Sequence, residues 1–177
     1  MKKISEIDDM TKNLCIKAIL IALTALFTMV IHIPTPATGG YINAGDAIIL
    51  ISAVFFGSNF GFAAGGFGSA LADILLGYAY WAPFTFIIKG LMGLFAGKLS
   101  DYKTSGNLFS ARNVFTTIFV EIFMVSGYFF SEAIFRGGFL SATQSVPGNI
   151  SQGVGGIIIF FSLGTLLHKS NFLNRLK

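Results

Sequence analysis

Two apolar runs joined by a short aromatic corner make up residues 60–99, which read FGFAAGGFGSALADILLGYAYWAPFTFIIKGLMGLFAGKL. Each run is long enough to cross a bilayer as a helix. Each also carries one ionisable residue, Asp73 in the first and Lys89 in the second. A charge at membrane depth costs about 2.5–3.5 kcal/mol on insertion scales, so it indicates a functional site or a pair that faces the protein interior. The runs therefore predict two neighbouring transmembrane helices that present polar groups inward.

Small or charged residues stand at every fourth position of both runs. These positions are 61, 65, 69, 73 and 77 in the first run, continuing a row that starts at Gly57 just before it, and 89, 93 and 97 in the second. In lipid, helices associate through close packing rather than through the hydrophobic effect, and small residues let their backbones approach. The spacing predicts that the two helices pack tightly against each other.

The composition extends this interpretation to the whole chain. Of its 177 residues, 54% are apolar and 11% are charged, whereas a soluble domain carries about 25% charged residues. The mean hydropathy is +0.74. These values predict a multi-pass membrane protein with a single domain, residues 1–177. The basic residues flank the apolar runs, so they indicate topology rather than binding to nucleic acid.

The pattern predicts an all-α membrane protein, a bundle of six transmembrane helices. The expected helices cover residues 14–33, 44–56, 60–77, 83–99, 113–135 and 149–168. The first is too long for the apolar region of a signal peptide and no cleavage site follows it, so we expect it to be retained. Ten of the twelve cations fall on one side of this topology, which places both termini in the cytoplasm. Cys15 is the single cysteine, which excludes an internal disulfide.

The polar residues of the expected helices gather near their outer ends. At about 1.5 Å per residue, Asp73 lies roughly 6 Å and Lys89 roughly 9 Å below the outer ends of their helices. Asp46, Glu132 and Asn149 also fall in the outer third of the membrane, and Glu121, roughly 12 Å above the inner end of its helix, is the exception. Channels and proton relays string polar groups through the full thickness. This one-sided cluster instead predicts a pocket that opens outward and captures a solute.

We predict that the substrate-binding residues are Asp73, Lys89, Asn149, Gln152, Glu132, Tyr80, Trp81 and Asn43. The first two either form a structural ion pair or contact the ligand. Asn149 and Gln152 share a helix face. Their amides either form hydrogen bonds with the ring of a ligand or form hydrogen bonds between helices. Asn149 alternatively caps the N-terminus of its helix. Tyr80 and Trp81 either stack on a flat ligand or belong to an interfacial belt.

Some side chains are assigned less specifically. Glu132 is either solvated or bound to ligand. Tyr41, His32 and Thr38 flank the first outer loop, where a lid is expected.

Catalytic and metal-binding patterns are missing from the sequence. There is no His/Cys/Glu cluster and no nucleophile–base pair, and the glycine-rich FAAGGFG lies within a helix rather than in a phosphate-binding loop. We therefore expect no enzyme activity, no metal, no bound cofactor and no ATPase in this chain. Ala18, Ala22 and Ala25 form a small-residue face on the first helix, which suits contact either within the bundle or with a partner.

Four strings resemble the substrate-binding (S) components of energy-coupling factor (ECF) vitamin transporters: GSALADILLGY at 68–78, FIIKGLMGLFAG at 86–97, EIFMVSGY at 121–128 and PGNISQGVGG at 147–156. They are most similar to the riboflavin-transporter-like branch that includes pyridoxine and hydroxymethylpyrimidine carriers. The resemblance covers nearly the whole chain.

The resemblance implies a six-helix bundle in the bacterial plasma membrane that binds a vitamin or precursor near the outer face, under the first outer loop as a lid. Pyridoxine or hydroxymethylpyrimidine is favoured, and riboflavin comes next. It also implies that the alanine face of the first helix docks on a transmembrane coupling protein. Two partner ATPases would then use the ATP. The alternatives are a stand-alone secondary transporter or channel, which predicts a continuous polar path or inverted repeats, and a membrane enzyme, for which no constellation is present.

Overall fold

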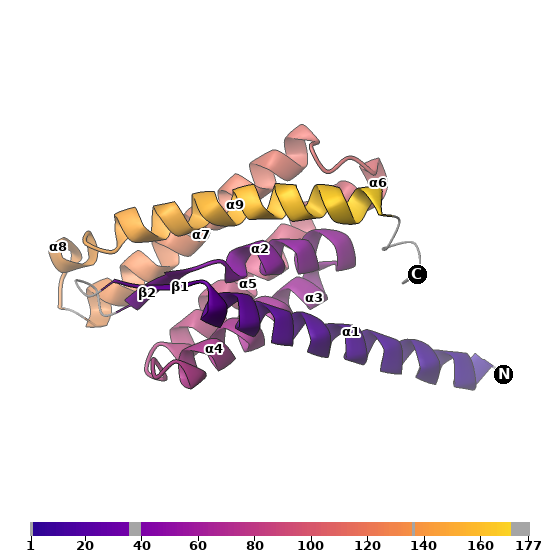
Figure 1. Cartoon of the computed structure of the whole chain (residues 1–177), viewed down its shortest axis with the longest axis horizontal. Coiled ribbons are helices and arrows are strands. Elements are labelled where there is room, and N and C mark those ends of the chain that lie inside the picture. Colours follow the sequence, from indigo (N-terminus) through magenta and orange to yellow (C-terminus); the bar gives the residue numbers. More distant parts are fainter. Residues whose placement is uncertain (1, 36–39, 136, 171–177) are drawn as a thin grey trace.

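A computed structural model describes residues 2–35, 40–135 and 137–170, and helices dominate it (Figure 1). The four long helices are α1 (Lys2–Val30), α5 (Ala82–Leu99), α7 (Ala111–Phe135) and α9 (Val146–Lys169). Two further helical stretches are α2 (Gly45–Ile51) continued by η1 (Ser52–Phe56), and α3 (Ser58–Ala63) continued by η2 (Ala64–Gly68) and α4 (Ser69–Leu75). Short helices α6 (Tyr102–Ser105) and α8 (Phe139–Ala142) lie in the connections.

The protein is a helical multi-pass membrane protein. Within the described residues, four stretches are long and apolar enough to span a membrane, judged by length and composition: Asp9–Val30, Ala82–Ser105, Ala111–Phe135 and Phe139–Lys169. The apolar helix Gly45–Phe56 is shorter. All six helices expected from the sequence have a helical counterpart. Six membrane crossings and the cytoplasmic placement of the termini stay predictions.

The first expected helix and the loop after it differ from the prediction. The helix was expected at 14–33, but α1 begins at Lys2 and ends at Val30. His32–Thr35 forms strand β1, which pairs antiparallel with β2, Gly40–Asn43. Pro34 explains the early end, because the residue before a proline is pushed toward extended backbone. Thr38 lies outside the described residues.

Two π-helical turns, η1 and η2, interrupt the second and third expected helices. A π turn adds a residue to the helical repeat, so it rotates the side chains that follow it, and such turns are frequent at functional sites. η2 leads directly into α4, which carries Asp73. Gly57 ends η1 with a φ of 113°, a backbone conformation that glycine adopts without strain.

The helices form a closed ring in which α1 packs on α2, α2 on α9, α9 on α7, α7 on α5, and α5 on α3, η2 and α4, which return to α1. Every residue of α2 is buried. The hairpin, the α4–α5 corner and α8 lie at one end of the molecule, which we call the hairpin end. The start of α1, α6 and the end of α9 lie at the opposite end (Figure 1).

The predicted close approach of the 60–77 and 83–99 helices is confirmed. A Cβ atom on Gly61 would lie 2.5 Å from the carbonyl oxygen of Gly93, and one on Gly65 would collide with the carbonyl of Lys89. The two helices therefore touch through their backbones, as small residues in membrane helices allow.

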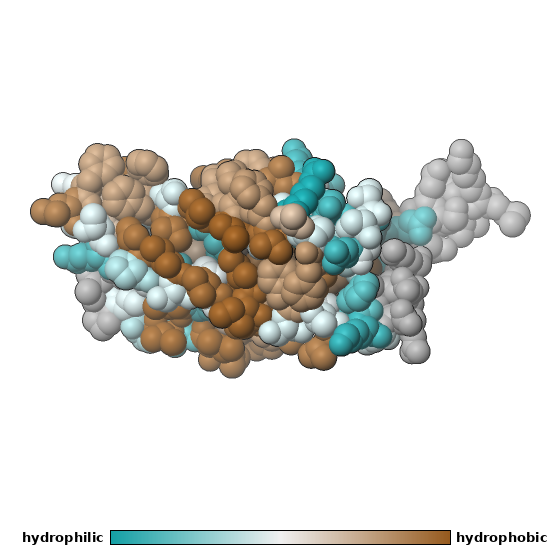
Figure 2. Space-filling model, turned by 90° about the horizontal axis from the view of Figure 1, so that it is seen from above, coloured by the Kyte–Doolittle hydropathy of each residue, from teal (hydrophilic) through white to brown (hydrophobic). Residues whose placement is uncertain are grey.

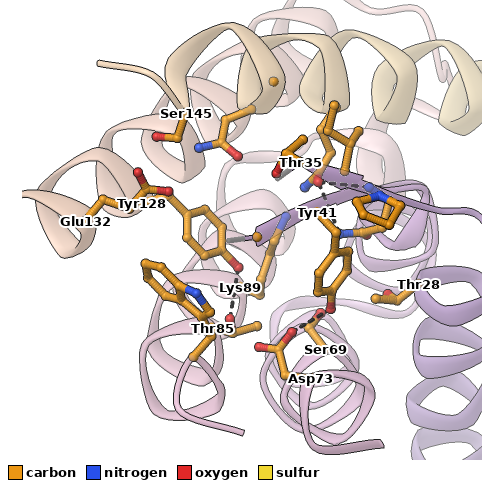
Figure 3. Close-up of a pocket in the computed structure, with 18 of the residues that line it drawn as sticks. Thr28, Thr35, Tyr41, Ser69, Asp73, Thr85, Lys89, Tyr128, Glu132 and Ser145 are labelled. Carbon is orange, nitrogen blue, oxygen red and sulfur yellow. Dashed lines mark hydrogen bonds between the residues drawn. The ribbon is translucent and has the colours of Figure 1, made fainter. Parts of the chain in front are cut away.

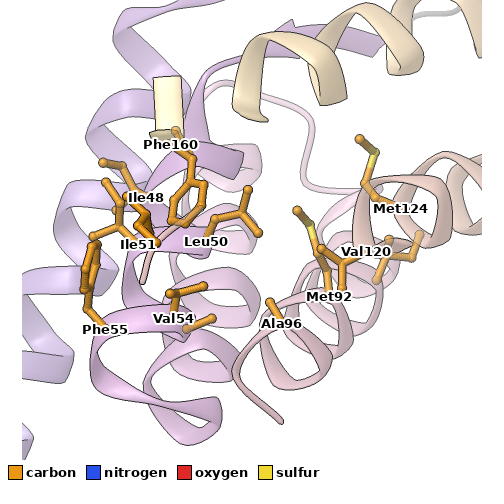
Figure 4. Close-up of a cluster of buried hydrophobic side chains, with 14 residues drawn as sticks. Ile48, Leu50, Ile51, Val54, Phe55, Met92, Ala96, Val120, Met124 and Phe160 are labelled. Atoms are coloured by element: carbon orange, nitrogen blue, oxygen red, sulfur yellow. The ribbon is translucent and has the colours of Figure 1, made fainter. Parts of the chain in front are cut away.

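The hydrophobic core lies between the hairpin end and the opposite end. Figure 4 shows Ile48, Leu50 and Val54 facing Met92 and Val120 across the bundle. The outer surface is also apolar: Figure 2 shows a broad hydrophobic face, with hydrophilic groups gathered toward the opposite end. An apolar exterior of this extent suits contact with lipid rather than water.

Candidate functional site

A cavity of about 360 Å³ opens beneath the hairpin (Figure 3). Residues from β1, β2, α1, α4, α5, α7, α9 and the segments before α5 and α9 line it. These are Thr28, Pro34, Thr35, Gly40, Tyr41, Ile42, Asn43, Ser69, Asp73, Trp81, Thr85, Lys89, Tyr128, Glu132, Gln144, Ser145, Gly148, Asn149 and Gln152. The structure thus brings together seven of the eight predicted substrate-binding residues. Tyr80 is outside the lining.

Lys89 forms an ion pair with Asp46 in the floor of the cavity. Both side chains are buried, with 2% and 0% of their surfaces exposed. The sequence suggested Asp73 as the partner, and that pairing is wrong. Asp46 lies in the first turn of α2, and this helix is buried on all sides, so its carboxylate meets the ammonium group in the interior. Two buried charges that pair in this way avoid the high cost of an isolated one.

Gln152 connects this ion pair to the hairpin. Its Nε2 donates to Asp46 Oδ2 at 2.8 Å, and its Oε1 accepts from the backbone N–H and the Nδ2 of Asn43 at 3.0 and 3.1 Å. Asn43 Oδ1 in turn accepts from the N–H of Gly45. Of the two roles considered for the Gln152 amide, the structure displays the one that joins helices.

Asp73 holds the hairpin from the other side of the cavity. The Tyr41 hydroxyl in β2 donates to Asp73 Oδ1 at 2.5 Å (Figure 3). Burial and the neighbouring Asp73 charge raise the pKa of Tyr41 well above its usual value, so the hydroxyl keeps the proton that it donates. The rings of His32 and Tyr78 pack against Tyr41 at centroid distances of 4.8 and 4.9 Å.

The aromatic corner is divided between the cavity and the surface. Trp81 is 7% exposed and lines the cavity, whereas Tyr80 is 53% exposed and packs on the outer side of Trp81. Tyr128 completes this wall, and its hydroxyl donates to Thr85 Oγ1 at 3.1 Å. Tyr80 therefore has the position of an interfacial aromatic residue and Trp81 that of a cavity residue.

Glu132 and Asn149 line the far side of the cavity. Glu132 is 5% exposed, so the solvated alternative is wrong. Its contact with a ligand stays a prediction. The alternative of Asn149 as a helix cap is wrong, because α9 begins at Val146 and Ser145 precedes it. The helix starts earlier than expected because Pro147 is compatible with the first turn of a helix.

Among the buried polar atoms of the described cavity wall that have no hydrogen-bond partner are Thr28 Oγ1, Asp73 Oδ2 and Trp81 Nε1. A buried polar atom without a partner is costly, and the large majority of buried side-chain polar atoms in native proteins have one. These three atoms are therefore available to a polar ligand.

Sequence reasoning left out several cavity residues, notably Thr28, Ser69 and Thr85. Isolated hydroxyl residues in an apolar helix carry little signal. A partial signal existed for Tyr128, which precedes Glu132 by one helical turn and so shares its face.

The predicted docking face of α1 is divided. Ala18 and Ala22 are exposed on the surface, whereas Ala25 is 5% exposed and lies in the interior. Ala25 thus does not belong to an exposed face, because α1 turns this position toward its neighbours in the ring.

Within residues 2–35, 40–135 and 137–170, no group of three or more His, Cys, Asp or Glu side chains is arranged to hold a metal ion.

Comparisons with known proteins agree with this architecture. Residues 8–169 match the family model described as ECF-type riboflavin transporter, S component. The chain is 43% identical over 142 residues to an uncharacterized protein of Pyrococcus woesei, covering 80% of this chain and 92% of the relative. It is 30% identical over 164 residues to the thiamine precursor transporter HmpT of Lactococcus lactis, covering 92% of each chain. A UPF0397 protein of Streptococcus agalactiae is 30% identical over 158 residues, covering 80% of this chain and 84% of the relative.

Proposed function

Since the chain belongs to the family of ECF-type riboflavin transporter S components, and so to a family of transport components rather than enzymes, we propose that it is the substrate-binding subunit of an ECF-type vitamin importer. It captures a small aromatic vitamin or precursor in the cavity under the hairpin. An energy-coupling module then delivers the solute to the cytoplasm.

The observation that carries this proposal is the position of the cavity. Its polar lining lies at the hairpin end, and the apolar core of Ile48, Leu50 and Met92 fills the bundle beyond it. A transporter that works alone needs a polar path to both sides or a rearrangement of repeats. A cup with a closed floor suits a protein that binds a solute and depends on partners for transport.

The size of the cavity favours a ligand with one ring. Its volume of about 360 Å³ is at the lower end of the roughly 300–1,000 Å³ that small-molecule pockets span. Hydroxymethylpyrimidine or pyridoxine fits this volume better than the three fused rings and sugar-alcohol chain of riboflavin. The similarity to HmpT, named as a thiamine precursor transporter, points to the same class of solute.

The proposal includes an orientation and a set of partners. Six helices cross the bacterial plasma membrane, the hairpin end faces outward and both termini are cytoplasmic, in agreement with Lys98, Lys103 and Arg112 at the opposite end. Ala18 and Ala22 provide the exposed small-residue face that docks on a transmembrane coupling protein. Two cytoplasmic ATPases complete the importer.

Ligand binding to the purified protein tests this proposal. The protein reconstituted in lipid nanodiscs is titrated with hydroxymethylpyrimidine, pyridoxine and riboflavin, and its co-purified ligand is identified by native mass spectrometry. We expect stoichiometric binding of a one-ring compound. A folded protein that binds none of these compounds would refute the proposal. Uptake into proteoliposomes without ATP or partner proteins would favour the secondary-transporter alternative.

A further inference from the structure

The side chains of the cavity fall into two groups according to whether their hydrogen-bonding capacity is already used. Lys89 is paired with Asp46, and the amide of Gln152 is bonded to Asp46 and Asn43. These groups use their hydrogen bonds to connect α2, α5, α9 and the hairpin. By contrast, Thr28 Oγ1, Asp73 Oδ2 and Trp81 Nε1 are buried on the cavity wall without a partner.

The three unpartnered atoms define the ligand that would complement them. The Asp73 carboxylate accepts hydrogen bonds, the Trp81 indole N–H donates one, and the Thr28 hydroxyl does either. A matching ring offers a donor to Asp73, an acceptor to Trp81 and a hydroxyl or similar group to Thr28. An aminopyrimidine has a ring nitrogen beside an exocyclic amine, which places the acceptor and the donor on one edge.

The charges at the site disfavour an anionic ligand. Among the described lining residues Lys89 is the single Lys or Arg, and Asp46 already neutralises it. Asp73 Oδ1 accepts a hydrogen bond from the neutral Tyr41 hydroxyl, and the Thr85 hydroxyl also interacts with this carboxylate. A phosphate or carboxylate on the ligand would be held near the Asp73 carboxylate without a free cation to balance it, and like charges at close range in a low dielectric repel strongly.

We infer that Asp73 is the specificity-determining residue of the cavity: it requires a hydrogen-bond donor of the ring-amine type on the ligand and excludes the phosphate ester of the same compound. This inference rests on the proposed function, since it names the chemistry that the proposed site selects. It assigns the recognition to Asp73, Trp81 and Thr28 rather than to Lys89 and Gln152.

The experiment compares three probes on the purified protein in nanodiscs by isothermal titration calorimetry. The probes are hydroxymethylpyrimidine, its analogue without the amine, and its phosphate ester. A hydrogen bond to a charged group is lost with the amine, so we expect the analogue to bind roughly tenfold to a hundredfold more weakly. We expect the phosphate ester to bind more weakly still.

Asp73→Asn then assigns the selectivity to this residue. In that variant we expect the amine and its analogue to bind within about threefold of each other, because the charged acceptor is gone. Asp101→Asn is the matched control, since it makes the same substitution in a carboxylate outside the cavity that accepts from Ser110. We expect it to keep the wild-type preference.

The possible results separate the inference about Asp73 from the proposed function. Equal binding of all three probes by the wild type, or a preference that persists in Asp73→Asn, would overturn the inference and leave the proposed function standing. Failure of the folded wild type to bind hydroxymethylpyrimidine, pyridoxine or riboflavin would overturn both. The wild-type comparison of the three probes needs no variant, so it tests the inference even if Asp73→Asn does not fold.

Discussion

Replacing Lys89 by methionine removes one member of the buried Lys89–Asp46 pair and leaves the carboxylate uncompensated. The side chains of the pair are 2% and 0% exposed, so water cannot solvate the remaining charge. Breaking a buried pair by removing one partner costs about 3–5 kcal/mol. For a chain of this size that cost lowers the unfolding midpoint by roughly 6–20 °C.

The double variant Lys89→Met/Asp46→Asn separates the loss of the pair from the exposure of a lone charge. The asparagine still accepts the hydrogen bond that Gln152 donates to Asp46, and neither member of the pair leaves an unpaired charge behind. We therefore expect the double variant to regain at least about 2 kcal/mol of the loss, since residues in direct contact are coupled by up to about 3 kcal/mol. Thermal unfolding in nanodiscs, followed by circular dichroism, measures both values.

Lys98→Met is the matched control, because Lys98 lies on the same helix and is exposed. We expect its midpoint to stay within about 2 °C of the wild type, since single surface charges contribute little. The reasoning fails if Lys89→Met unfolds as late as this control, or if the double variant is no more stable than the single one. Equal ligand affinity in the folded double variant and the wild type would further indicate that Lys89 supports the cavity rather than contacts the ligand.

Three further predictions concern the hairpin, the helix packing and the aromatic wall. Tyr41→Phe removes the hydroxyl that donates to Asp73. Because a hydrogen bond to a charged group contributes about 1.5–3 kcal/mol, we expect affinity for hydroxymethylpyrimidine to fall by about tenfold. Calorimetry measures this affinity, and an unchanged value would contradict the prediction. Gly61→Leu presses a side chain into the backbone of α5, so its folded yield should fall sharply, whereas Gly155→Ala, which meets open space, should match the wild type by size-exclusion chromatography. Trp81 is the single tryptophan and lines the cavity, so ligand should change the intrinsic fluorescence in a saturable way; a flat titration of a protein that binds by calorimetry would count against its cavity position.

Much of the helical framework was predictable because a bilayer imposes simple conditions on a sequence. A spanning segment must be apolar and about twenty residues long, and its backbone must be satisfied internally. The close contact of α3 and η2 with α5 was visible in the row of small residues, which lipid-embedded helices use for packing. The gathering of Asp73, Lys89 and Glu132 into one cavity followed from their similar distance from the helix ends.

Other features were not readable from local patterns. The expected loop after α1 contains a hairpin whose Tyr41 reaches Asp73. The π turns in η1 and η2 leave no signature in an apolar run, yet they rotate the side chains that follow. Ala25 is buried, whereas Ala18 and Ala22, which are the same residue type on the same predicted helix face, are exposed.

The sequence by itself determined that this chain is a helical membrane protein in which most polar side chains within the membrane lie toward one side of it, because the cost of placing polar groups in lipid acts on each segment separately. Which of those groups pair was decided by the tertiary structure. Lys89 meets Asp46 rather than Asp73 because the rotation and tilt of α2, α4 and α5 arise from their simultaneous packing with helices distant in the chain. Helical spacing gives a residue's depth in the membrane, but the partner that it faces depends on the whole ring of helices.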